Sequence, residues 1–334
     1  LNILPFMLKK EDLKIVFMGT PEFAVASLDA LVSNGYNVVG VVTQPDKPVG
    51  RHGSVLQAPP IKTYAIEHDI PVMQPERLKD DGFVATLEAL GANLFVVVAF
   101  RMLPEMVWSM PKYGTFNVHA ALLPQYRGAA PINWAIINGE KETGVTTFFL
   151  DKDIDTGRVI MQKKYAIGDE ENVESVYNAL MKLGAEICVE TVNEIIISNG
   201  KPESMPQSEM EANIPTLHHA PKLFKENCRI SWQWQAKYVH DFIRGLSPVP
   251  GAWTVLVTPD NKETVLKIYD SRLAADADID MPSGTMVRQG KRLLVVAAQG
   301  QAIEILSLQL AGKKRMDAVN FLNGMKNVED CTLA

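Results

Sequence analysis

Cysteine is scarce in this sequence of 334 residues. The three cysteines, Cys188, Cys228 and Cys331, lie far apart, and no pair has the C-x-x-C spacing that structural zinc sites usually show. Thiols so few and so widely spaced also argue against the dense disulfide framework of small secreted domains. We therefore expect three reduced thiols in a cytoplasmic protein, and no metal site.

Long apolar runs are missing as well. No run reaches the roughly 18 residues that a membrane-spanning helix requires, so we expect no membrane association. The apolar residues 1–8 lack a preceding basic region and a small-residue cleavage site, and they are too few for a signal peptide. Because Met7 is a possible start, we interpret residues 1–6 as read-through or a cloning remnant, and residues 1–12 as a disordered or non-native extension.

The glycine-rich signatures of nucleotide-binding folds are absent. A dinucleotide-binding domain has G-x-G-x-x-G after its first strand, whereas this sequence has Gly19, Thr20 and Pro21 there. Proline removes a backbone N–H where a pyrophosphate needs a donor. Since the P-loop lysine motif is also missing, the sequence disfavours both hydride transfer and P-loop chemistry.

The composition that remains is average for a globular protein, with 47% apolar and 22% charged residues. The formal net charge of −6 is unevenly spread, because residues 218–334 hold 15 Lys and Arg against 12 Asp and Glu, and the remainder holds 18 against 27. A mildly basic tail on an acidic body fits a protein that touches a polyanion with one part. Chance alone also produces asymmetries of this size.

The first two hundred residues alternate short apolar segments with helical ones. Residues 94–99 are apolar throughout, which is typical of a strand covered on both faces in a parallel sheet. The order of elements predicts an α/β domain with a doubly wound, mostly parallel sheet. Strands are expected at residues 13–18, 38–42, 71–73, 94–99, 115–119, 145–150 and 159–167, and helices at 21–33, 61–68, 83–90, 131–138 and 173–197. The many prolines and glycines of residues 44–60 predict neither helix nor strand there.

The pattern changes beyond residue 220. A helix at residues 234–244 precedes short strands with turn signals between them, which predict a small β-barrel, and a helix at 316–323 is expected to end the chain. These strands are expected at residues 252–257, 264–270, 284–287, 293–297 and 302–308. The polar residues 199–220 are interpreted as a linker between one domain at 13–198 and another at 221–334.

Asn117 and His119 form the most informative pair of polar residues. They are two apart on the predicted strand 115–119, so both side chains leave the same face. They also lie at the carboxyl end of that strand, where open α/β sheets bind ligands. The pair is either a catalytic amide and imidazole or a buried pair that satisfies loop backbone.

A second acidic segment follows at residues 151–157. Its alternate acids resemble a calcium loop, but the sixth and twelfth positions of that pattern hold Thr156 and Gln162 instead of Gly and Glu. We interpret Asp151 and Asp153 as solvated. Asp155 differs because a glycine follows two residues later, and we expect the tight turn it permits to direct this carboxylate inward.

Three segments together resemble the folate-dependent formyltransferases. They are N-V-H-x-x-L-L-P beginning at Asn117, R-G-A-A-P-I beginning at Arg127, and I-D-T-G ending at Gly157. Residues 17–24, 42–51 and 306–314 are similar, more narrowly, to the members of this family that act on methionyl-tRNA. The resemblance extends over residues 13–323, which is nearly the whole chain.

The resemblance implies transfer of a formyl group from 10-formyltetrahydrofolate to the α-amine of initiator methionyl-tRNA, without a metal and by a chain expected to be monomeric. Asn117, His119 and Asp155 match the family's catalytic residues. The folate-contacting loop corresponds to Ala121, Leu122, Leu123 and Pro124, and the loop that contacts tRNA contains Lys47 and Arg51. The second domain resembles an OB-like barrel that holds tRNA backbone.

Three departures from the family pattern accompany the resemblance. Ala121 replaces a usual Ser, and Asp153 replaces a Gly that is often found there. The proline-rich loop has the cations Lys47, Arg51 and Lys62, whereas relatives often carry a lysine pair after the arginine. Two other functions stay open, namely formyl transfer to an amino sugar nucleotide or another small amine, and a silent tRNA-binding module that kept the fold.

The three matched residues suggest how the reaction would proceed. A neutral amine attacks the formyl carbon, and negative charge then develops on the formyl oxygen, where donors are needed. The Asn117 amide donates without titrating, and His119 donates when it is protonated. Asp155 orients the imidazole or takes the proton of the amine, and the sequence leaves the route of each proton open.

Overall fold

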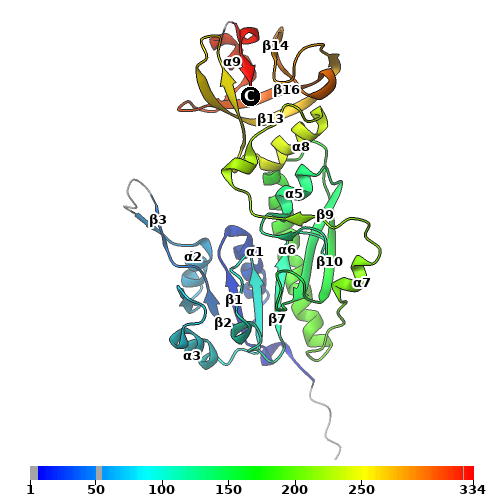
Figure 1. The fold of residues 1–334 in the computed structure, drawn as a ribbon. Helices are drawn as coiled ribbons and strands as arrows, with labels where there is room; N and C mark the ends of the chain where they lie inside the picture. Colours follow the sequence, from blue (N-terminus) through cyan, green and yellow to red (C-terminus); the bar gives the residue numbers. More distant parts are fainter. Residues whose placement is uncertain (1–6, 50–54, 326) are drawn as a thin grey trace, which may run out of the picture. The chain divides into compact units, whose positions relative to one another are not determined.

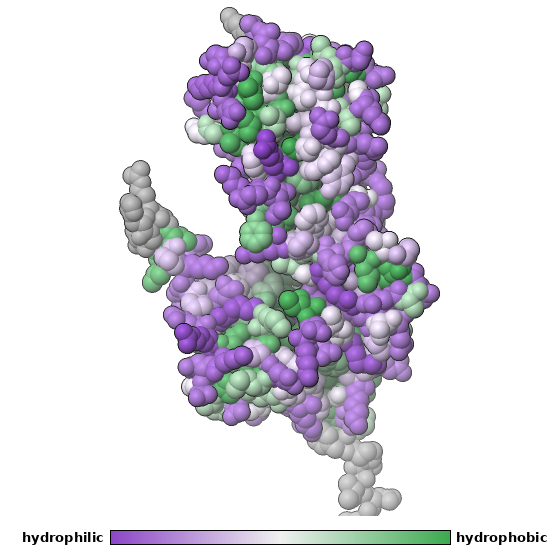
Figure 2. All heavy atoms as spheres, viewed as in Figure 1, coloured by the Kyte–Doolittle hydropathy of each residue, from purple (hydrophilic) through white to green (hydrophobic). Residues whose placement is uncertain are grey.

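The chain forms two compact units in a computed structural model that describes residues 7–49, 55–325 and 327–334 (Figure 1). The first unit consists of Leu1–Gly128, Gly144–Tyr165 and Asn178–His218. The second consists of Ala129–Thr143, Ala166–Tyr177 and His219–Ala334. The visible face of each unit is mostly hydrophilic, with apolar residues in small groups (Figure 2).

A seven-stranded sheet with the order β10-β9-β7-β6-β1-β2-β5 forms the centre of the first unit. Neighbouring strands from β7 to β5 are parallel, and β9 runs antiparallel to β7. The predicted doubly wound, mostly parallel sheet is therefore confirmed. The strands are β1 (Ile15–Gly19), β2 (Val38–Val42), β5 (Val72–Met73), β6 (Leu94–Val98), β7 (Thr115–His119), β9 (Glu142–Phe149) and β10 (Val159–Ala166).

Burial on both faces explains the continuous apolar runs of the central strands. Every residue of β1 and of β6 is buried. On one face, Val16 of β1 and Phe95 of β6 belong to a core cluster with Phe83 of α3 (Asp81–Ala89). Alternate residues point to the other face, where α1 (Glu22–Ser33) packs on β1 and β6.

The remaining helices of the first two hundred residues agree with the predicted ones to within two residues at each end. They are α2 (Pro60–Glu67), α5 (Pro131–Ile137) and α6 (Val173–Ile197). One further short helix, α4 (Glu105–Trp108), was not predicted, because four residues are too few for a helical period. No helix among the described residues combines the length and the apolar character that crossing a membrane requires.

An antiparallel sheet with the order β14-β15-β16-β13-β12-β18 forms most of the second unit. An isolated bridge between Thr285 and Thr332 joins the two edges of this sheet, so the sheet curls into a barrel, as predicted. The strands are β12 (Ala252–Val257), β13 (Glu263–Asp278), β14 (Met286–Gln289), β15 (Arg292–Val296), β16 (Gln301–Leu310), β17 (Met316–Asp317) and β18 (Thr332–Leu333).

Two features of the barrel differ from the prediction. Strand β13 extends to Asp278 instead of ending at residue 270, because register shifts along its pairing with β16 interrupt the alternation of apolar residues. The last helix, α9 (Ala318–Gly324), does not end the chain, since β18 follows it and pairs with β12. A two-residue strand has no alternation from which to predict it.

Helix α8 (Ala236–Leu246) packs its apolar face into the core of the second unit. It buries Val239, Phe242 and Ile243 in a cluster with Leu256 and Ile268 of the sheet. Their spacing places these apolar side chains on one stripe of the helix. The helix begins and ends within two residues of the predicted bounds, because this stripe is visible in the sequence.

The proline-rich residues 44–60 are not structureless. Strands β3 (Lys47–Val49) and β4 (Val55–Gln57) pair antiparallel, so the expectation of neither helix nor strand was wrong. Both strands of a two-stranded ribbon are edge strands, where proline is tolerated, and Pro48 lies in one of them. Residues 50–54, including Arg51, lie outside the described residues.

Two other segments carry more structure than their composition indicated. Residues 7–12, expected as part of a disordered or non-native extension, are ordered: Leu8 is buried, and its N–H donates to the Oδ1 of Asn199 at 2.8 Å. Residues 1–6 lie outside the described part of the chain. The expected linker 199–220 contains the helix α7 (Gln207–Glu211) and the strand β11 (His219–Ala220). Outside this segment, a further two-residue strand, β8, comprises Arg127–Gly128.

Candidate active site

Strand β7 presents Asn117 on the same face as His119 at the carboxyl end of the sheet. Asn117 pairs in register with Val97 of β6 and with Phe148 of β9. Its side chain is half-buried, and its Oδ1 atom is buried without a hydrogen-bond partner among the described residues. Because a buried acceptor without a donor costs about 1–3 kcal/mol, we expect a water or a bound molecule to supply the donor to this atom.

His119 has one ring nitrogen committed to the backbone. The side chain is 7% exposed, and its Nε2 lies 2.9 Å from the carbonyl oxygen of Tyr126. Since a carbonyl only accepts, Nε2 carries a hydrogen and donates. The Phe148 ring meets the imidazole edge-on, with 6.5 Å between the ring centroids. In the neutral ring Nδ1 is therefore the atom with the lone pair.

Asp155 faces that second nitrogen. Its Oδ2 lies 3.8 Å from Nδ1 of His119, and the side chain is 13% exposed. The same oxygen accepts a hydrogen bond from the N–H of Gly128 at 3.0 Å. The structure thus brings together the imidazole and the carboxylate predicted from two distant segments. At 3.8 Å the two atoms are too far apart for a direct hydrogen bond.

The turn that carries Asp155 has an unusual backbone. Asp155 itself has φ 56°, a left-handed conformation that is uncommon for residues other than glycine. Asp151 and Asp153 are exposed, in agreement with their interpretation as solvated. Gly157, which we expected to permit the tight turn, does not itself have a positive φ. Its role is close approach, because a Cβ at this position would lie 1.6 Å from the carbonyl oxygen of Phe149.

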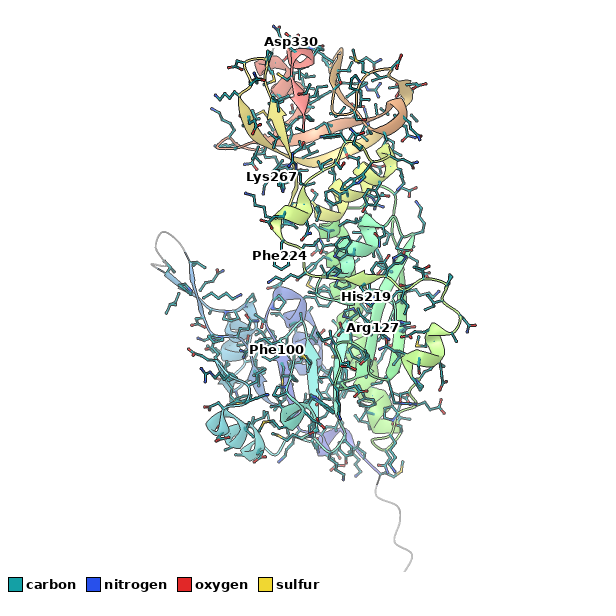
Figure 3. The ribbon with its side chains drawn as sticks, viewed as in Figure 1. Phe100, Arg127, His219, Phe224, Lys267 and Asp330 are labelled. Atoms are coloured by element: carbon teal, nitrogen blue, oxygen red, sulfur yellow. The ribbon has the colours of Figure 1, made fainter. Side chains whose placement is uncertain are left out.

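A polar network anchors the main chain of this turn. The Gln207 amide donates to the carbonyl oxygens of Asp155 and Gly157, both at 2.8 Å. Arg127, labelled in Figure 3, donates to the Oε1 of Gln207 through Nε at 2.9 Å and through Nη2 at 2.6 Å. Arg127 also pairs with Glu211 at 2.7 Å. The backbone around Asp155 is therefore fixed by a side chain from α7.

The predicted folate-contacting loop is held firmly from within the first unit. The Thr146 hydroxyl donates to the carbonyl of Ala121 at 2.6 Å and accepts from the N–H of Leu123 at 3.1 Å. The Gln162 amide donates to the carbonyl of Leu123 at 2.8 Å. The Leu123 side chain lies in an apolar cluster, so both its backbone groups and its side chain are already used. Leu122 is the half-buried member of the loop, whereas Pro124 is buried.

The cations of the predicted tRNA loop differ in their surroundings. Lys47 is exposed on β3. Lys62 forms an ion pair with Asp46 at 2.8 Å, so its charge is largely compensated. A hydrogen bond from Gln74 and the one from Lys62 hold the pKa of Asp46 below its ordinary value. Arg51 lies outside the described residues.

Sequence reasoning missed the groups that support the catalytic candidates. Arg127 and Gly128 belong to the R-G-A-A-P-I motif, so a signal was present, but neither had been given a role. The Tyr126 carbonyl and Gln207 had no signal, because a main-chain contact and a glutamine in a polar segment leave no pattern. Among the described residues, no group of three or more His, Cys, Asp or Glu is placed to hold a metal ion.

Comparison with known proteins identifies relatives over nearly the whole chain. The formyl transferase family matches residues 13–192, and the formyl transferase C-terminal domain matches residues 222–326. Methionyl-tRNA formyltransferase from Parabacteroides distasonis is 54% identical over 326 residues, which is 98% of this chain and 100% of the relative. The protein of the same name from Bacteroides fragilis is 54% identical over 322 residues, 96% of this chain and 98% of the relative.

Solved structures share the fold at low sequence identity. The sugar 3N-formyl transferase WlaRD, crystallised in the presence of dTDP and 5-N-formyl-THF, has a TM-score of 0.60 at 19% identity and covers 90% of this chain and 99% of its own. HypX from Aquifex aeolicus has a TM-score of 0.60 at 16% identity, over 94% of this chain and 47% of its own. The chain described here belongs to the formyl transferase family, in the group that holds these methionyl-tRNA formyltransferases.

Proposed function

We propose that this chain transfers the formyl group of 10-formyltetrahydrofolate to the α-amine of methionyl-tRNA. The observation that carries this proposal is the meeting of Asp155 and His119 at 3.8 Å, with Asn117 on the same face of β7 as the histidine. The names of relatives that are 54% identical over nearly the full length support methionyl-tRNA as the acceptor. We assign the catalytic roles to these three residues.

Two acceptor atoms face each other across the space between His119 and Asp155. With Nε2–H bound to Tyr126, the neutral imidazole offers the lone pair of Nδ1 toward the Asp155 carboxylate. A gap of 3.8 Å between two acceptors suits an N–H or O–H group that lies against both. We infer that the attacking amine, or a water that carries its proton, occupies this position and gives up its proton there.

Proton uptake then changes what His119 does. Neutral Nδ1 cannot donate, but a protonated imidazole presents Nδ1–H, and the carboxylate of Asp155 stabilises the positive charge. Donors are needed where negative charge develops on the formyl oxygen. In this proposal the Asn117 amide supplies a donor that does not titrate, and its Oδ1 has no internal hydrogen-bond partner among the described residues.

The formyl donor binds, in our proposal, next to the loop Ala121, Leu122, Leu123 and Pro124. The backbone groups of Leu123 are internally bonded, so Leu122 is the residue of this loop with side-chain surface to offer. The donor supplies the formyl carbon. As the bond from this carbon to the folate nitrogen breaks, the protonated His119 imidazole returns its proton to that nitrogen, directly or through water, so the acceptor amine is formylated and the folate leaves without the formyl group. The protein's part is to hold the formyl carbon beside Asn117 and His119, because correct placement of the reacting groups lowers the barrier.

We propose that the barrel of the second unit binds tRNA backbone. Strands β12 and β13 put Trp253 directly opposite Lys267, which is labelled in Figure 3. The Arg229 guanidinium lies over the Trp253 ring at 5.5 Å, and that of Arg315 lies over the Tyr269 ring at 4.6 Å. Cations that stack on partly exposed aromatic rings suit a surface for phosphates and bases. We assign the second tRNA contact to the hairpin β3–β4, through Lys47 and Arg51.

We further propose a monomer that acts in the cytoplasm on the initiator form of methionyl-tRNA. The first domain, residues 13–198, carries the reaction, and residues 221–334 carry the barrel. The three cysteines are free and buried, which suits a reducing compartment. Sedimentation at micromolar concentration tests the monomer, and paired assays with initiator and elongator methionyl-tRNA test the choice of acceptor.

One assay decides the proposed function. The purified chain is incubated with 10-formyltetrahydrofolate and either methionyl-tRNA or an amino sugar nucleotide. We expect formylmethionyl-tRNA to form only when both substrates are present, and the amino sugar to remain unmodified. Formylation of the sugar without formylation of methionyl-tRNA would establish the alternative acceptor and overturn the proposal.

A further inference from the structure

One segment of the first unit holds both members of the catalytic pair in place. Residues 205–218, here named the strap, follow the long helix α6 and have the polar composition of a linker. Gln207, near the start of the strap, contacts the turn of Asp155. His218, at its end, contacts the segment that accepts the hydrogen bond of His119. These contacts are independent of any role in binding substrates.

Gln207 is the first point of attachment. It is 2% exposed and uses its whole side-chain amide, since Nε2 donates to the carbonyls of Asp155 and Gly157 and Oε1 accepts from Arg127. With all its polar atoms occupied, Gln207 has none left for a substrate. Its effect on the reaction must therefore pass through the turn that it holds.

The conformation of Asp155 explains why such an attachment is needed. A φ of 56° is less costly for aspartate than for most residues with a side chain, but it is still an uncommon conformation that surrounding contacts help to hold. The carbonyl of Asp155 accepts from Gln207 at 2.8 Å and from Nε of Arg127 at 3.2 Å, and the N–H of Gly128 fixes its carboxylate. Loss of the shorter bond leaves only the longer one from Arg127, so the backbone is held less firmly in the left-handed region, and we expect the carboxylate to move away from Nδ1 of His119.

The other end of the strap fixes the acceptor for His119. The Gln125 amide donates to the carbonyl of Thr216 at 2.8 Å and accepts from the N–H of His218 at 2.7 Å. The N–H of Tyr126 donates to the carbonyl of His218 at 2.7 Å. Tyr126 also has a positive φ, 59°. The carbonyl that orients the imidazole thus belongs to a residue held by the strap.

We propose that Gln207 is a positioning residue for the formyl transfer and acts through the Asp155 carboxylate. This inference rests on the proposed function, because it assumes that Asp155 takes part in the reaction. The strap keeps the His119 and Asp155 atoms at the separation that the attacking amine needs. A small displacement of a reacting group lowers turnover without weakening the binding of either substrate.

Two variants separate the bonds that Gln207 makes. Gln207→Leu removes all of them with little change in volume, and Gln207→Glu keeps the acceptor for Arg127 but loses the donors to the Asp155 and Gly157 carbonyls. We expect kcat to fall roughly 10- to 100-fold in both, with both KM values within about twofold. Glu209→Gln, exposed on the same helix, is the control and keeps the normal rate. Normal turnover in Gln207→Glu overturns the proposal.

A double-variant cycle with Asp155→Asn tests the route of the effect. If Gln207 acts through the Asp155 carboxylate, adding Gln207→Glu to Asp155→Asn lowers the single-turnover rate by no more than about twofold. If Gln207 has a purely structural role, the rate of the double variant falls by the product of the two single-variant factors, and that result overturns the inference. Thermal unfolding of each variant is recorded alongside.

The same cycle distinguishes this inference from the proposed function. A normal rate in Asp155→Asn alone contradicts the role of the carboxylate and hence the proposed mechanism. If Asp155→Asn alone is slow, and Gln207→Glu lowers the rate of Asp155→Asn by the same factor as it lowers the normal rate, only the positioning role of Gln207 is contradicted.

Discussion

The hydrogen bond from Nε2 of His119 to the carbonyl of Tyr126, at 2.9 Å, decides which atom of the imidazole meets Asp155. The acceptor is a main-chain oxygen seven residues along the chain and does not titrate. A ring flip would break this bond inside a buried site, so we expect Nδ1 to keep facing Oδ2 of Asp155 during the reaction. Nε2 thus orients the ring through the backbone, and Nδ1 is the nitrogen available for proton transfer.

Replacing Asp155 tests whether its carboxylate takes part in the reaction. Asp155→Asn keeps an oxygen for the N–H of Gly128 but loses the negative charge and the basic atom near His119. We expect kcat to fall by roughly 10²–10⁴, the usual cost of losing a proton-transfer group, while the melting temperature stays within a few degrees. Single-turnover formylation and thermal unfolding measure the two effects. A variant with near-normal turnover removes Asp155 from the mechanism.

Gly157 is expected to tolerate no side chain. A Cβ there would lie 1.6 Å from the Phe149 carbonyl oxygen and 2.8 Å from its carbonyl carbon, so main chain would have to move. We expect Gly157→Ala to destabilise the first unit by about 2 kcal/mol or more and to lower kcat by displacing Asp155. Gly324→Ala is the matched control, because nothing lies within 4 Å of that position. Equal urea midpoints for the two variants would contradict the prediction.

A buried ion pair in the second unit provides a test of stability that is separate from the active site. Asp241 and Arg244 of α8 are 3% and 5% exposed and meet at 2.8 Å, and Arg244 also donates to the carbonyl of Glu171 at 2.9 Å. Arg244→Met leaves Asp241 buried, with Lys237 as its remaining cation. We expect a loss of about 3 kcal/mol, at the lower end for a broken buried pair.

The second substitution in that pair supplies the control. Adding Asp241→Asn to Arg244→Met removes the buried charge that has lost one of its two cations, so the double variant is expected to regain part of the lost stability. Hydrogen exchange of the α8 amides in the full chain measures the change locally. A double variant that is less stable than Arg244→Met alone would show that the buried charge is not the cause.

Regular periodicity determined which parts of this fold were predictable. Strand β2 and helix α6 agree with the prediction at both ends, because each presents a single uninterrupted pattern. The shared face of Asn117 and His119 followed from the alternation of side chains along a strand. Strand β13 was predicted too short because its bulges break that alternation.

The partners of the site depended on tertiary contacts that no local pattern records. The place of Asp155 near His119 came from a family resemblance, since 36 residues separate them along the chain. Gln207 lies in a segment whose polarity indicated a solvated linker, yet it is 2% exposed and fully hydrogen-bonded. The burial of a single amide in a polar segment depends on neighbours that are distant in sequence, so the composition of the segment does not reveal it.

The hairpin β3–β4 begins beside a carboxylate whose titration is predictable. Hydrogen bonds from Gln74 and Lys62 lower the pKa of Asp46 below its ordinary value of 3.8. The ionised form therefore stabilises this contact at any pH above that value, and the contribution is lost as pH falls through the lower, folded-state pKa. Gln74→Leu and Lys62→Met are each expected to raise the pKa of Asp46, because the first removes the largest hydrogen-bond contribution and the second removes both a hydrogen bond and a positive charge. Carbon-detected NMR titration of Asp46 measures both, and an unchanged pKa in Gln74→Leu would contradict the assignment.

Salt dependence tests the proposed tRNA surfaces. If Lys267 contacts a phosphate, Lys267→Ala releases one counterion fewer, and the slope of log Kd against log salt concentration decreases by about 0.7–0.9. Arg51→Ala is expected to act in the same way, whereas the affinity for the folate donor stays unchanged in both variants because neither residue belongs to the proposed folate loop. Lys291, exposed beyond the end of β14, supplies the control, and Lys291→Ala keeps the original slope. Equal slopes for the Lys267 and Lys291 variants would mean that the barrel attracts tRNA through its net charge, without a defined contact at the Trp253 and Lys267 pair.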